Sequence, residues 1–95
     1  MGRPSFQEYE AEALAEGFDE VAERLWEPLA EAPTHSHPFA VRALVVAGDL
    51  WLTVDGNERH LRAGDTFEIE RDAPHAERYG PEGATYWAAR RHRQG

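Results

Sequence analysis

Glycine residues recur at a regular interval along the second half of this chain. Gly48, Gly56, Gly64 and Gly80 are separated by multiples of eight residues, and Asp72 stands in the gap of the series. Short strands separated by turns at this spacing are typical of an all-β barrel or sandwich. The strands that this rhythm predicts have the sequences AVRALVVA, DLWLTV, RHLR, TFEIER, HAERY and TYWAARR.

A short helix is predicted before the strands, over residues 6–16. Ser5 and Glu8 have the spacing of a capping box, in which each side chain accepts a hydrogen bond from the other residue's backbone N–H. Gly17 follows at a position where it can end the helix.

Residues 18–31 are ambiguous in the sequence. Phe18, Val21 and Leu25 have the spacing of a helix face. Pro28 would end such a helix early, and the residue before a proline is pushed toward an extended backbone. The local pattern therefore leaves both a second helix and a strand open.

The length and the charge of the chain limit its possible functions. The 95 residues suffice for one domain, and the absence of cysteine excludes disulfides, zinc ribbons and thiol nucleophiles. Residues 1–33 carry nine carboxylates against two arginines, within a chain of net charge −8, so we expect no nucleic-acid partner. The sequence shows no signal peptide and no apolar run long enough to cross a bilayer. We therefore expect no membrane partner and a cytoplasmic protein.

Three histidines are candidate metal ligands. His35 and His37 are two residues apart, so on a strand their side chains point to the same side, and His75 would have to arrive from another strand. Imidazole nitrogens bind zinc at about 2.0–2.1 Å, so such side chains can converge on one ion. A His-x-His pair is also common without a metal, in which case the histidines are structural. His60 and His92 are interpreted as solvent-facing.

The order and spacing of these motifs resemble those of a known protein superfamily. The segment HSHPFAVRALVVAGDLWLTVDG, followed by LRAGDTFEIERDAPHAE, resembles the two consecutive motifs of the cupin superfamily, in particular its small single-domain members. The resemblance implies an antiparallel, jelly-roll-like β-barrel over residues 18–95, with residues 1–17 as a helical extension. It also implies a strand at residues 20–28, because cupins lead into His-x-His from a strand. The matching residues are His35, His37, Gly48, Gly64, Asp65, Phe67, Ile69, Pro74 and His75.

The chain departs from the cupin pattern at one ligand position. Val41 stands where the family has a glutamate ligand, and the neighbouring Arg42 cannot bind a cation. Glu77 has the same strand parity as His75 and could face the same interior. Arg42 is expected on the outer face; its alternative role is an anchor for an acidic substrate. The pocket candidates are Glu77, Tyr79, Trp87 and Val41, and the main expected role of the strand aromatics Trp51, Phe67, Tyr86 and Trp87 is packing.

The resemblance implies a class of function and no particular substrate. The first expectation is one divalent first-row transition metal (Fe, Mn, Ni, Cu or Zn) in an oxygenase or isomerase that acts on a small organic molecule. The alternatives are a non-catalytic domain that binds or senses a small ligand, and a metal-free structural barrel. We also expect a homodimer, since small cupins often pair through barrel faces or swapped strands.

Overall fold

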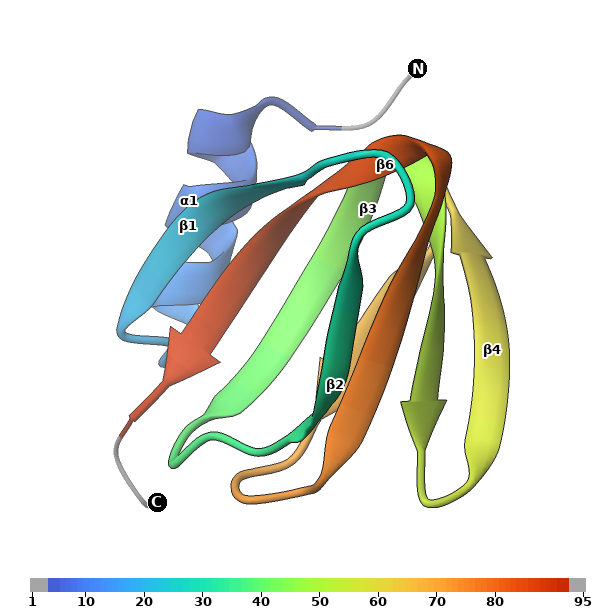
Figure 1. The fold of residues 1–95 in the computed structure, drawn as a ribbon. Helices are drawn as coiled ribbons and strands as arrows, with labels where there is room; N and C mark the ends of the chain where they lie inside the picture. Colours follow the sequence, from blue (N-terminus) through green and yellow to red (C-terminus); the bar gives the residue numbers. More distant parts are fainter. Residues whose placement is uncertain (1–3, 93–95) are drawn as a thin grey trace.

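The computed structural model describes residues 4–92 and is built almost entirely from antiparallel strands (Figure 1). One short helix precedes the strands. The elements are α1 (Phe6–Ala15), β1 (Glu20–Trp26), β2 (Glu31–His35), β3 (Ala40–Val54), β4 (Asn57–Arg62), β5 (Thr66–Ile69) and β6 (His75–Arg91).

The long strands β3 and β6 form the centre of the fold. They pair antiparallel from Ala40 opposite Arg91 to Val54 opposite His75. Both strands bend, so each takes part in two halves of one folded sheet (Figure 1). One half adds β1 and β5 to them, and the other adds β2 and β4. The predicted antiparallel, jelly-roll-like fold with a short helix is confirmed, although within residues 4–92 the sheet does not close into a full ring.

Two glycines let the long strands bend. Gly48 has a φ of +70°, and a Cβ there would lie 2.0 Å from the carbonyl oxygen of Gly83. Gly83 also has a φ of +70°, and its Cβ would lie 2.2 Å from the carbonyl oxygen of Trp26. The backbones of β3, β6 and the end of β1 therefore stack at the bend with no room for side chains.

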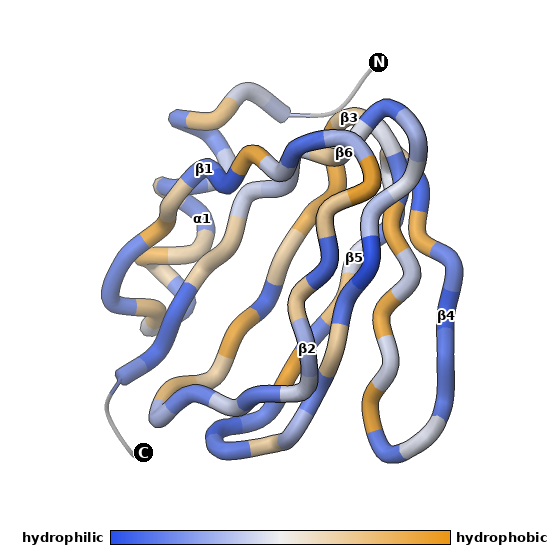
Figure 2. The backbone as a smooth tube through the Cα atoms, viewed as in Figure 1, coloured by the Kyte–Doolittle hydropathy of each residue, from blue (hydrophilic) through white to orange (hydrophobic). Residues whose placement is uncertain are grey.

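The bend changes which residues of β3 face the interior. Val41, Ala43 and Val45 face the interior before Gly48, whereas Leu50 and Leu52 do so after it. The pairing of β3 with β6 shifts register on both sides of Gly48, and across this irregular segment the interior side changes from odd-numbered to even-numbered residues. β4 lies at an edge and is mostly hydrophilic (Figure 2), with Leu61 as its buried residue. The other buried members of this core are Phe67, Ile69, Tyr79, Ala84, Tyr86 and Ala88.

The helix α1 packs on the outer face of the sheet. Its Phe6 and Tyr9 cover a second apolar cluster formed by Leu44, Val46 and Trp87. The Phe6 ring meets the Trp87 ring edge to face, with centroids 5.5 Å apart.

The ends of α1 agree with the sequence. Both hydrogen bonds of the predicted capping box between Ser5 and Glu8 are present. At the other end, Glu16 pairs with Arg42 at 2.6 Å, which places Arg42 on the outer face, as expected. The predicted boundary between residues 17 and 18 falls in the connection from α1 to β1.

The strand boundaries differ from the sequence prediction at the bend. Residues 20–28 contain the strand β1, which settles the helix-or-strand ambiguity of this region in favour of the strand. The turns predicted at Gly48 and Gly80 are wrong as strand ends, because these glycines lie inside β3 and β6. Within residues 4–92 no helix has the length and apolar character that a membrane crossing requires.

Candidate metal centre

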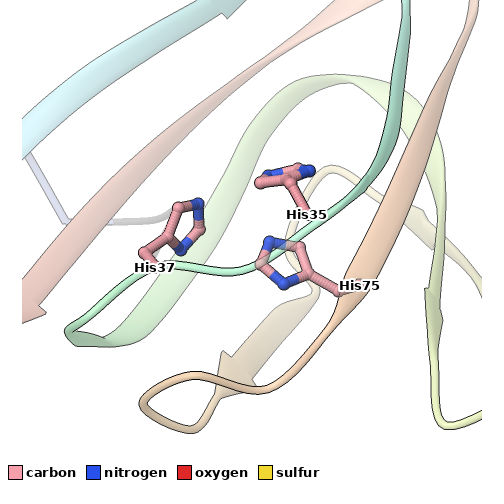
Figure 3. Close-up of side chains that lie close together, drawn as sticks. All are labelled: His35, His37 and His75. Carbon is pink, nitrogen blue, oxygen red and sulfur yellow. The ribbon is translucent and has the colours of Figure 1, made fainter.

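Two strands and one loop bring three histidines together. His35 ends β2 and lies directly opposite His75, the first residue of β6. His37 follows β2 by two residues and turns its ring toward the other two (Figure 3). One ligand nitrogen of each residue lies within 4.8 Å of those of the other two. Donors at about 2.1 Å from one ion are at most about 4.2 Å apart, so a small closure of the rings would suffice.

Backbone carbonyls orient two of the rings. Nδ1 of His35 lies 2.7 Å from the Pro33 carbonyl oxygen, and Nδ1 of His75 lies 2.9 Å from the Ala73 carbonyl oxygen. A carbonyl oxygen can only accept, so each Nδ1 carries the proton and each neutral ring keeps a free lone pair on Nε2. This is the tautomer in which Nε2 can bind a metal.

The loop that carries His37 is held by the turn between β5 and β6. The Asp72 N–H donates to the His37 carbonyl oxygen at 2.8 Å, and Arg71 donates to the Pro38 carbonyl oxygen at 2.5 Å. The ring of His37 stacks on Phe39 with a centroid distance of 4.7 Å. Burial lowers the pKa of His37 below its ordinary value, and the imidazoles of His75 and His35 lower it further. The neutral form, which is the form that binds metals, is thereby favoured.

One buried carboxylate lies beside the histidines. The Glu77 residue is 8% exposed, and its Oε2 lies 3.5 Å from Nε2 of His75 and 3.8 Å from Nε2 of His35. The Tyr79 hydroxyl donates to its Oε1 at 2.5 Å, and burial raises the pKa of Tyr79 well above the usual range. Glu77 therefore faces the interior next to the histidines, while the position where the cupin resemblance implies a glutamate ligand is held by the apolar Val41.

The residues fit a metal ion. Nε2 of His75 is buried and has no hydrogen-bond partner among the described residues, and neither has Nδ1 of His37. Leaving such atoms unpaired in the interior costs about 1–3 kcal/mol each. A cation bound by the imidazoles would remove that cost at His75.

The sequence of this structural core matches a known family. The model of the cupin domain family matches residues 24–85, which is more than half of the chain. The chain belongs to the cupin domain family. No curated protein matches this cupin.

Solved structures resemble this cupin over most of its length. KdgF from Halomonas sp. has a TM-score of 0.73 at 18% identity, over 82% of this chain and 72% of that chain. The DMSP lyases RdDddP and RnDddQII give a TM-score of 0.71 at 22% identity, over 76% of this chain and 37% of that chain. The cupin domain of an XRE family transcriptional regulator from Enterobacter cloacae gives 0.65 at 20% identity, over 79% and 82%. At these identities the similarity shows a shared fold.

A cavity opens beside the histidines of this cupin. Its volume is about 180 Å³, and Glu77 and Val41 line it together with the three histidines. Tyr79 stands behind Glu77, where its ring stacks on Trp26 at 4.7 Å. The remaining lining residues are Arg24, Trp26, Ala32, Phe39, Phe67, Ile69, Tyr86, Ala88 and Arg90.

Trp51 and Trp87 both lie outside the cavity, although Trp87 has the packing role that was mainly expected of it. Trp87 packs under α1 on the outer face, so it does not line the cavity. Trp51 lies outside the main core and stacks on His60 at 4.2 Å. The register shifts around Gly48 cause the error at Trp51, because they reverse the alternation on β3.

The other two histidines take no part in the site. His92 is exposed, as predicted, and pairs with Glu20. His60 differs from the expectation, because it is only partly exposed and its Nε2 lies 2.6 Å from Oδ2 of Asp49.

The cavity residues on β1 were not among the candidates predicted from the sequence. Arg24 and Trp26 lie on the interior side of β1, and Arg90 lies near the end of β6. Alternation along β1 could have identified Arg24 and Trp26, but the helical spacing of residues 18–31 obscured it.

Proposed function

We propose that this cupin binds one divalent first-row transition-metal ion through His35, His37 and His75, and that the ion serves a small organic molecule in the adjoining cavity. The observation that carries the proposal is the convergence of three imidazole donors within 4.8 Å, two of them fixed by backbone carbonyls in the tautomer that binds metals. Fe, Mn, Ni, Cu and Zn all accept imidazole ligands.

A bound ion with open positions would polarise a carbonyl or activate a water molecule. The chain's own contribution lies in Glu77 and the groups around it. Its Oε2 is close enough to His75 and His35 to serve as a further ligand or to accept a proton from a molecule beside them. The Tyr79 hydroxyl fixes the other carboxylate oxygen, so Glu77 is held in one orientation.

Two kinds of function fit this site. Catalysis on a small organic molecule is favoured by the buried carboxylate beside the imidazoles, and the DMSP lyases among the similar structures support it. Ligand sensing without turnover is the second candidate. The cupin domain of a transcriptional regulator supports this alternative, since the present chain spans 82% of that domain.

The first test is elemental analysis of untagged protein. We expect about one ion per chain in the wild type and less than a tenth of that in the double variant His35→Ala/His37→Ala, because removing two of three ligands leaves a single imidazole. His92→Ala is the matched control, since it removes an exposed imidazole outside the site, and it should retain the ion.

A double variant that keeps the full metal content would refute the assignment. With metal present, oxygen uptake and product analysis with small phenols and diketones test the oxidative reaction. Ligand-dependent shifts of the melting temperature without turnover would favour sensing.

We also propose that the chain forms a homodimer. The observation behind this is the outer face over β2, β6, β3 and β4, where a surface depression is lined by Trp51 and Thr53 of β3 and Ala76 of β6. Sedimentation of the purified chain would test the proposal, and a monomer at high concentration would contradict it.

A further inference from the structure

Two arginines, Arg24 and Arg90, are among the residues that line the cavity. Arg24 lies on β1 and Arg90 lies near the end of β6. These two strands pair antiparallel from Glu20 opposite Arg90 to Trp26 opposite Ala84. The net charge of the chain is −8, so the positive charge of two arginines in this cavity is opposite in sign to the net charge of the molecule.

The contacts of the two guanidinium groups differ. Arg90 pairs with Glu20 at 3.6 Å and lies 5.2 Å from the centre of the Phe39 ring. Arg24 lies 5.4 Å from the centre of the Trp26 ring, and in the part of the chain that the structure describes it forms no ion pair. Arg24 therefore has its donors available for a ligand, and Arg90 has a weak partner that a ligand could replace.

The cavity contains both metal-binding and cationic side chains. The histidines and Glu77 occupy the side formed by β2 and the start of β6, whereas the arginines stand on β1 and the end of β6. The rings of Trp26 and Phe39 lie beside the arginines and offer flat apolar surfaces. Arg90 lies close to His37, because the Phe39 ring contacts both residues, whereas Arg24 lies beside Trp26. A molecule in this space would therefore meet metal-binding groups and two separate cations.

The volume limits the size of that molecule. A dry cavity of about 150 Å³ holds a benzene molecule, and the present cavity has about 180 Å³. A ligand enclosed here would have on the order of six to ten non-hydrogen atoms, by scaling from the benzene case.

We propose that the cavity takes a small carboxylic acid whose carboxylate pairs with Arg24, while its uncharged part lies against Trp26, and that Arg90 adds to the positive charge that attracts the acid. The planar guanidinium group matches a carboxylate with two parallel hydrogen bonds. The inference rests on the proposed function only for the metal ion that the rest of the ligand would meet. It names the class of ligand that the site would take.

Calorimetric titration with paired probes tests this inference. Benzoate and hexanoate are the acids, and benzamide and hexanamide are their uncharged counterparts of similar shape. We expect the acids to bind more tightly than the amides, and Arg24→Gln to weaken acid binding about tenfold or more, because a hydrogen bond to a charged group is lost. Amide binding should change little. Arg90→Gln should act in the same direction, and Arg62→Gln, which removes an exposed arginine outside the cavity, should leave both affinities unchanged.

The titrations are run on metal-free and zinc-loaded protein, with the metal content measured separately. Equal binding of acids and amides, no binding of either acid, or an unchanged affinity in Arg24→Gln would overturn the inference. Acid binding that depends on Arg24, in a protein that retains no metal after purification or zinc loading, would support the inference and refute the proposed metal function. About one metal ion per chain, together with equal binding of acids and amides, would support the proposed metal function and overturn this inference.

Discussion

His37 makes the stability of the metal-free protein depend on pH. Burial lowers its pKa in the folded chain below the ordinary 6.5, with the imidazoles of His75 and His35 contributing. The unfolded chain therefore takes up this proton at a higher pH than the folded chain does. The free energy of unfolding should be level above about pH 6.5 and should fall as the pH drops below it. Chemical denaturation of metal-free protein between pH 7.5 and 5 measures this loss.

Variants separate His37 from the other acid-sensitive groups. His37→Gln should show a smaller loss of stability between pH 7.5 and 5 than the wild type, because the group that resists protonation is gone. His92→Gln changes an exposed imidazole and should retain the wild-type loss. An identical pH dependence in His37→Gln and the wild type would show that this ring does not contribute.

The histidines were predictable from the sequence, and the cations were not. The spacing of His-x-His and of a later histidine after a Gly-Asp strand can be read without knowledge of the detailed fold, and parity relative to His75 made Glu77 a candidate for the same interior. Arg24 and Arg90 had no comparable signal, because an arginine on a strand is ordinarily exposed. The pairing of β1 with β6 places Arg24, from a segment with helical spacing, in the same cavity as Arg90.

At the scale of the strands, we expect the backbone at Gly48, in the bend, to be the position where an added side chain lowers the free energy of unfolding most. Gly48→Ala would add both the cost of a positive φ and a clash with the Gly83 carbonyl oxygen at 2.0 Å. Gly56→Ala is the matched control, since Gly56 has a φ of +74° with nothing within 4 Å of its Cβ. We expect Gly56→Ala to cost about 1–2 kcal/mol and Gly48→Ala about 2 kcal/mol more. Chemical denaturation would measure both, and equal losses would mean that the bend yields to a methyl group.

The same glycines explain how far the strands could be predicted. The eight-residue rhythm located turns correctly at Gly56 and Gly64, which connect β3 to β4 and β4 to β5. At Gly48 and Gly80 it located bends inside strands, since a glycine has the same sequence signature in a turn and at a close backbone contact. Tertiary contacts decide the conformation of β1, because its pairing with β6 overrides the helical spacing of residues 18–31.

Across the whole molecule, the two faces of the sheet serve separate purposes. The inner face carries the histidines and the cavity, and the outer face carries α1 on Leu44, Val46 and Trp87. Phe6→Ala should therefore lower the free energy of unfolding by about 1–3 kcal/mol, since the half-buried ring loses its contact with Trp87. The metal content and the preference for acids should remain unchanged.

Leu14→Ala is the control for this separation. Leu14 lies on the same helix but is 46% exposed, so its truncation should change stability by less than about 0.5 kcal/mol. Chemical denaturation and elemental analysis of the two variants measure both effects. If Phe6→Ala also removed the metal, the helix and the site would be coupled through the sheet. The outer cluster would then position the histidines as well as stabilise the fold.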